Sequence, residues 1–259
     1  MNGFLPEFAD LGREAFVAGF AVFLRVGTAM ALLPAVGERS VPQRIRLVLA
    51  LAYTAVVAPA VISAMPTAGA GVAGNVLLWT SEVAAGLAIG IGLRLFIIAL
   101  QVAGSMAAQA SSLAQLFGGE AADPVPAIGQ LLVIGGLALA VTAGLHVRIA
   151  ELLIFSYEML PPGRMPLGEA LTSWGVAGVA RMFSLAFSLA APLVIASLVY
   201  NIALGAINRA MPQLLVSFVG APAISAGALI LLALSAPFVL AAWLDALGGF
   251  LANPFTWTP

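Results

Sequence analysis

The stretch SEVAAGLAIGIGLRLFIIALQVAGSMAAQ, Ser81 to Gln109, carries only two charged residues, Glu82 and Arg94. A helix needs about 20 apolar residues to cross the roughly 30 Å hydrocarbon core of a bilayer, and this stretch exceeds that length. The whole chain has the same character, with 62% hydrophobic and 8% charged residues. Soluble domains carry about 25% charged residues, so this chain cannot cover a globule with polar side chains. A membrane is therefore its expected solvent.

Six apolar stretches divide the chain and predict an all-α, polytopic membrane protein with one domain over residues 1–259. The first two are long enough for one crossing, whereas the last could hold a crossing plus an extra helix, or a kinked hairpin. Pro192 and Pro237 lie inside the last two and predict kinks. The stretches are Ala15–Leu33, Leu47–Met65, Val76–Val102, Ala127–Leu153, Val176–Ile207 and Leu214–Leu251.

The composition argues against several classes of function. A net charge of −1 gives no basic surface for nucleic acid. The chain has no cysteine and one histidine, which makes a metal site improbable. No nucleotide-binding loop, zinc-protease motif or nucleophile elbow occurs in the sequence. We therefore expect neither an enzyme nor a cofactor.

Charged residues inside the apolar stretches are the first candidate site: Arg25, Glu82, Arg94, Arg148 and Glu151. Each costs at least about 2.5 kcal/mol at the bilayer centre, so such residues usually face protein or water. Arg148 and Glu151 are spaced to pair on one helix face. Glu82 and Arg94 lie about 18 Å apart along a helix, so each needs a partner elsewhere. The set is interpreted either as structural charge pairing or as an ion path.

Small residues form a second pattern. Gly86, Gly90 and Gly92 cluster in GLAIGIG, and AGSMAAQASSLA from Ala103 to Ala114 has almost no bulk. Small residues at four-residue spacing let membrane helices approach closely. The pattern indicates ordinary helix packing, or a crowded axis that is shared with other subunits.

Three stretches together resemble the FliR family, the R subunit of the flagellar type III export gate. The most specific match lies in YNIALGAINRAMPQLLVSFVGAPA, from Tyr200 to Ala223. It is the NRAMPQ turn with the VGAP that follows it. A second is LRVGTAMALLPAVGERSVPQRIRLVLAL, Leu24 to Leu51, with its spacing of Arg25, Pro34, Gly37 and Pro42. The stretch from Ser81 to Gln109 completes the resemblance, which covers nearly the whole chain.

The resemblance implies kinked helical hairpins that assemble with related subunits into a helical ring. It implies P-type, Q-type and B-type gate subunits as partners, and transient contact with unfolded flagellar substrates that leave the cytoplasm through the ring. It also implies a place in the inner membrane, at the flagellar basal body. The alternatives are the equivalent subunit of a virulence-type secretion system and, from another class, a small secondary transporter. A transporter should show repeats and a midplane polar cluster, and the sequence shows no repeat.

The resemblance further implies a pore plug in the middle of the chain, at Ser111–Pro126. Its candidate residues are Leu113, Leu116, Phe117, Gly118 and Gly119, which combine apolar bulk with a glycine hinge. The alternative is an ordinary surface turn between two helices.

The resemblance also suggests residues that hold the assembly together. The candidates for structural or inter-subunit contacts are Arg25, Glu82, Arg94, Asn208 and Arg209.

Overall fold

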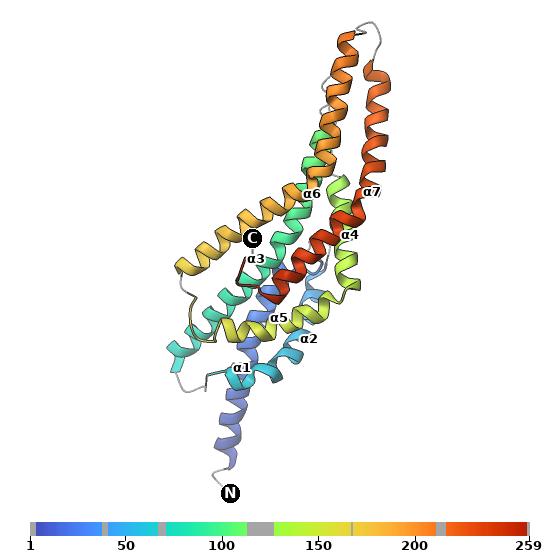
Figure 1. The fold of residues 1–259 in the computed structure, drawn as a ribbon. Coiled ribbons are helices and arrows are strands. Elements are labelled where there is room, and N and C mark those ends of the chain that lie inside the picture. The colour runs from blue at the N-terminus through green and yellow to red at the C-terminus, as the bar shows by residue number, and fades with distance from the viewer. Residues whose placement is uncertain are drawn as a thin grey trace. The chain divides into compact units, whose positions relative to one another are not determined.

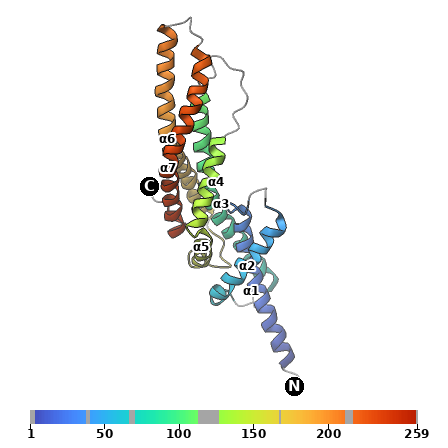
Figure 2. The ribbon, with the colours of Figure 1, turned by 90° about the vertical axis from the view of Figure 1, so that its right-hand side faces the viewer.

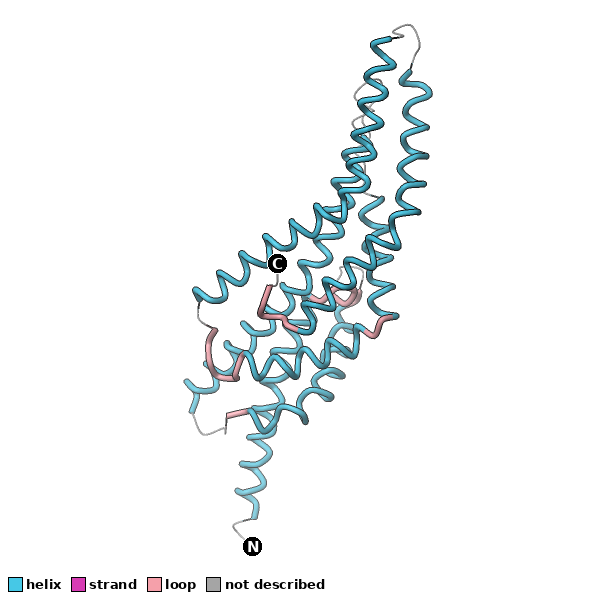
Figure 3. The backbone as a smooth tube through the Cα atoms, viewed as in Figure 1, coloured by secondary structure: helices cyan, strands magenta, loops and turns pink. Residues whose placement is uncertain are grey.

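The computed structural model describes residues 4–37, 41–66, 71–112, 127–166, 168–210 and 216–257. Within these ranges the chain is helical with short loops, and it contains no strand (Figure 3). The all-α prediction is confirmed. The helices are α1 (Phe4–Leu32), α2 (Gln43–Val61), the short 3-10 helix η1 (Ile62–Ala64), α3 (Gly71–Ser112), α4 (Ala127–Thr142), α5 (Leu145–Met159), α6 (Gly168–Ala210) and α7 (Val216–Ala252) (Figure 1).

Five of the described helical segments are long and apolar enough to cross a membrane: Gly12–Leu32, Gln43–Ala64, Val72–Gln109, Gly168–Ile207 and Leu229–Ala252. They correspond to five of the six predicted stretches. The polytopic character is therefore confirmed. The last stretch forms one continuous helix, α7, so the alternative of a hairpin there is wrong.

The fourth apolar stretch is broken, which the sequence analysis did not anticipate. α4 ends at Thr142 and α5 begins at Leu145, so a two-residue break at Ala143 and Gly144 separates them. Gly144 adopts φ +84°, a left-handed conformation that glycine tolerates without steric cost. Its carbonyl then accepts hydrogen bonds from the amides of Val147 and Arg148, at 3.0 and 3.2 Å, and so begins α5.

The contacts of the chain fall into two compact units. Unit 1 comprises residues 1–95, 143–178 and 249–259, and unit 2 comprises residues 96–142 and 179–248. α3, α6 and α7 each contribute to both units, so neither unit is one consecutive piece of chain. The prediction of a single export-gate domain stays a prediction.

In unit 1, α2 packs against α1 and α5, as Figure 2 also shows for α1 and α2. The buried side chains of α1, α3 and α5 include Val22, Ile89 and Leu152. In unit 2, Trp243 of α7 is fully buried, and its Nε1 donates to the carbonyl of Phe96 in α3 at 2.8 Å.

α3 and α4 approach closely in unit 2 because two glycines face each other. A side chain at Gly104 of α3 would overlap the backbone of Gly129 in α4. A side chain at Gly136 of α4 would meet Leu100 and Trp243. The small residues of α3 therefore serve helix packing within the chain at this point.

Candidate functional site: a buried charged cluster

Arg25 of α1 and Glu82 of α3 form a buried ion pair in unit 1. Nε of Arg25 donates to Oε2 of Glu82 at 2.8 Å, and Nη2 donates to Oε1 at 2.7 Å. The side chains are 1% and 0% exposed. Two parallel hydrogen bonds give such a pair both strength and a fixed geometry.

Residues at the end of α5 satisfy the remaining polar atoms of the pair. Nη1 of Arg25 donates to Oγ of Ser156 at 3.1 Å, and Nη2 donates to the carbonyl of Leu160 at 2.8 Å. The hydroxyl of Tyr157 donates to Oε2 of Glu82 at 3.1 Å. The guanidinium carbon lies 3.7 Å from the centre of the Tyr157 ring, which adds a cation–π contact.

Glycines in α3 allow α1 to come near enough for this pairing. A side chain at Gly86 would overlap Thr28 and the backbone of Arg25, and one at Gly90 would meet Ala29 and Leu32. Gly86 and Gly90 of GLAIGIG thus pack α3 against α1 of the same chain, whereas a side chain at Gly92 would meet Phe250. These glycine contacts are helix packing within the chain.

The loop after α5 is tied to the same region. The amide of Gly163, a glycine with φ +74°, donates to Oγ of Ser81 at 3.0 Å. Ser81 precedes Glu82 in α3, so the α5–α6 loop is held beside the ion pair.

The cluster holds helices of the chain together. Its two charges cancel, and both are sealed from solvent within the chain. An ion path would need further titratable groups in series, and the described contacts of the pair lead to a serine, a tyrosine and a backbone carbonyl. Three helices that are far apart in the sequence are joined here, so the cluster fixes the relative positions of α1, α3 and α5.

A second set of contacts in unit 1 fixes the C-terminal residues after α7. Nε1 of Trp174 in α6 donates to the carbonyl of Pro254 at 3.0 Å. The ring of Trp257 lies 4.9 Å from that of Phe250 and 5.5 Å from that of Trp174, measured between ring centres. Gly178 of α6 leaves the space that the Trp257 ring fills.

The other predicted residues are not brought into the cluster. Arg94 lies in α3, half-buried, with no hydrogen bond or ion pair to any described residue. Asn208 lies in α6, and Arg209 is exposed in its last turn. The proposed plug residues Leu113, Leu116, Phe117, Gly118 and Gly119 lie outside the described residues.

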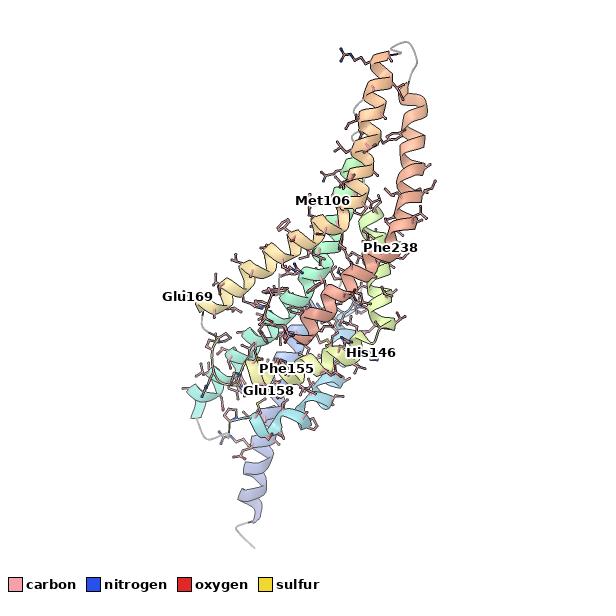
Figure 4. All side chains as sticks on the ribbon, in the orientation of Figure 1. Met106, His146, Phe155, Glu158, Glu169 and Phe238 are labelled. Carbon is pink, nitrogen blue, oxygen red and sulfur yellow. The ribbon has the colours of Figure 1, made fainter. Side chains whose placement is uncertain are left out.

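Arg148 and Glu151, which the sequence spacing would allow to pair, form no ion pair within the described part of the chain. Both are exposed on the outer face of α5, which also carries Glu158. Figure 4 labels His146, Phe155 and Glu158 on this helix. The inner face of α5 is the one that supplies Ser156 and Tyr157.

Sequence reasoning missed four residues. Ser156 and Tyr157 carry no signal of their own, because only the fold brings them to Arg25. Arg181 of α6 and Asp245 of α7 could have been found from the sequence, because each is a charge inside an apolar span. Among the described residues, no group of three or more histidines and acidic side chains could hold a metal ion.

These features define a class: a polytopic helical membrane protein whose bundle is fixed by a buried ion pair and glycine contacts. The family described as "Bacterial export proteins, family 1" matches residues 16–249. The flagellar biosynthetic protein FliR of Caulobacter vibrioides is 34% identical, over 95% of this chain and 96% of that protein. The chain therefore belongs to the FliR family of bacterial export proteins.

Two more distant relatives bear the same name. The flagellar biosynthetic protein FliR of Escherichia coli is 29% identical, over 78% of each chain. That of Bacillus subtilis is 27% identical, over 81% of this chain and 82% of its own length.

Proposed function

We propose that this chain is a pore-forming structural subunit of the flagellar type III export apparatus. It helps form the channel through which unfolded flagellar substrates leave the cytoplasm. The observation that carries the proposal is the relationship to FliR of C. vibrioides over nearly the full length of both chains. The three relatives named above are flagellar biosynthetic proteins, which favours the flagellar machine over a virulence-type system.

The location that fits this role is the bacterial inner membrane, at the flagellar basal body. Membrane-length apolar helices and family membership support the membrane location. The role of the chain is structural, because its best-defined polar site ties helices together.

Unsatisfied faces of the helices support assembly with other subunits. Within the chain, 67% of the membrane-length span in α3 is buried. Only 17% of the span in α2 is buried, and the same share of the span in α7. Arg94 and Arg181 are half-buried charges in apolar spans and lack an ion pair within the described chain. A charge at membrane depth usually faces protein or water, so these two arginines favour contact with other subunits or with a water-filled channel. We infer that P-type, Q-type and B-type gate subunits cover these faces.

The residues predicted to make structural or inter-subunit contacts then separate into two groups. Arg25 and Glu82 satisfy each other within the chain, so they act as structural charges. Arg94, Asn208 and Arg209 remain the candidates for contacts with other subunits. Arg209 lies in the last turn of α6, where a cation can meet the negative end of the helix dipole.

The segment 111–126 is proposed to close the pore. A channel wide enough for an unfolded chain would leak ions at rest, and apolar constrictions can close a pore by excluding water. Leu113, Leu116 and Phe117 supply the apolar bulk, and the Gly118–Gly119 pair supplies the hinge. Deleting Leu116–Glu120 should raise the resting conductance of the assembled complex in a planar bilayer. If the deletion complex assembles and its resting conductance does not rise, the partner subunits must close the pore.

The function as a whole is tested by removing the gene and restoring it. Cells without the chain should secrete no flagellar proteins into the medium and should not swim, and the restored chain should reverse both defects. A tagged copy, extracted in mild detergent, should carry other gate subunits with it. Normal secretion without the chain, or a tagged copy that recovers no other gate subunit, would count against the proposal.

A further inference from the structure

Asp245 is the sole charged residue of the apolar span Leu229–Ala252 in α7. It lies seven residues before the end of that span, about 10 Å along the helix. Its side chain is exposed, and no described residue gives it a hydrogen bond or an ion pair. The described part of the chain therefore leaves this carboxylate unpaired within a membrane-length helix.

Asp245 points away from the core of unit 2. Trp243, Val239 and Leu232 form the buried side of α7. Asp245 follows Trp243 by two positions, which is about 200° around a helix, and so lies on the opposite face.

The neighbours of Asp245 on that outer face are of two kinds. Ala241 and Ala242 are exposed and lie one turn before it, and Phe238 lies one turn further back and is 78% exposed. Phe238 is labelled on α7 in Figure 4. Two small residues beside a carboxylate and a protruding ring make a surface on which another helix can pack closely.

Lipid is a poor neighbour for this surface. A charged side chain at membrane depth almost always faces protein or water, and aspartate is too short to reach the interface as lysine and arginine do. Anionic headgroups would be repelled by the carboxylate. Small residues at helix surfaces serve helix–helix contact, which favours protein as the neighbour.

We propose that the α7 surface formed by Phe238, Ala241, Ala242 and Asp245 docks a membrane helix of another subunit that presents an arginine or lysine to Asp245. The inference rests on the proposed function and deepens it, because it gives the chemistry of one subunit contact. The carboxylate accepts a charge-assisted hydrogen bond, and the alanines let the two backbones approach.

Three variants of a tagged copy of the chain, each co-expressed with the other gate subunits, test this contact. They are Asp245→Leu, Asp245→Asn and Asp245→Glu. The measured quantity is the amount of complex recovered per tagged chain after mild detergent extraction and sizing. The leucine and asparagine variants should recover about tenfold less complex or worse, because they leave a buried cation unpaired in the partner. The glutamate variant keeps the charge and should restore most of the complex.

Glu158→Leu is the matched control, because it also replaces an exposed acidic residue by leucine, on α5. It should leave recovery unchanged. The near-isosteric asparagine variant separates loss of contact from misfolding, since its size is that of aspartate and its side chain is exposed in the single chain.

The outcomes separate the two proposals. If the unaltered chain recovers other gate subunits and the leucine and asparagine variants recover them equally well, the docking surface is refuted and the proposed function stands. If the unaltered chain recovers no gate subunit, both fall. A reduced yield with Asp245→Asn that Asp245→Glu reverses supports the contact.

Discussion

Replacing Glu82 by leucine would leave the guanidinium of Arg25 buried without its carboxylate. The change removes the hydrogen bonds of 2.8 and 2.7 Å from Arg25, and it takes away the acceptor of the Tyr157 hydroxyl. Arg25 would keep its hydrogen bonds to Ser156 and to the carbonyl of Leu160 and its contact with the Tyr157 ring. Breaking a buried ion pair by removing one partner costs about 3–5 kcal/mol. The folded-to-unfolded ratio should therefore fall about 100-fold or more.

Replacing both partners should cost much less than the single change. In an Arg25→Met, Glu82→Leu double variant no buried charge is left unpaired, and apolar replacements of buried ion pairs are often nearly neutral. We expect the double variant to be less destabilised than the sum of the two single changes by at least about 3 kcal/mol, because each single change leaves one buried charge unpaired and the double change leaves none.

Unfolding of the purified chain in mixed detergent micelles, followed by the fluorescence of its four tryptophans, measures these differences. Glu158→Leu is the control, because Glu158 is exposed and its replacement should change the free energy of unfolding by less than about 0.5 kcal/mol. A Glu82→Leu variant within about 1 kcal/mol of the unaltered chain would refute the structural role of the cluster. So would a double variant no more stable than the sum of the single changes.

Three further changes test other contacts. Trp243→Phe removes the donor to the Phe96 carbonyl and should lower the free energy of unfolding by about 1–3 kcal/mol, measured as above. Gly104→Leu should cost about 1–3 kcal/mol or more, because its side chain would overlap Gly129; an unchanged unfolding midpoint would contradict the close approach. Arg209→Ala should lower swimming speed by weakening assembly, and normal complex yield without export would show that explanation to be wrong.

The fold was largely predictable, because a membrane imposes its demands directly on the sequence. A helix that crosses lipid must satisfy its backbone internally and present apolar side chains, and this fixes length and composition. The break at Gly144 was not predictable from apolarity, since the stretch from Ala127 to Leu153 reads as one continuous run. One glycine in a left-handed conformation interrupts the helix there.

The site was predictable only in part. Sequence reasoning required a partner for Glu82 on another helix or chain, and the structure supplies Arg25 from α1. It could not find Ser156 and Tyr157, because serine and tyrosine are common and only three-dimensional proximity makes them ligands of the pair. Asp245 was missed for a different reason. It could have been recognised from the sequence as a charge in an apolar run, but it was not considered.

The measurement that tests the pore-forming role most directly is cross-linking of a stalled export substrate. The chain has no cysteine, so a single introduced cysteine reports one position without background. A substrate that carries its own cysteine and is stalled during export should form a disulfide with Phe117→Cys in the proposed plug. It should form none with Val176→Cys on the exposed side of α6. An export-competent complex whose stalled substrate never cross-links to Phe117→Cys, or cross-links equally to both positions, would contradict the account.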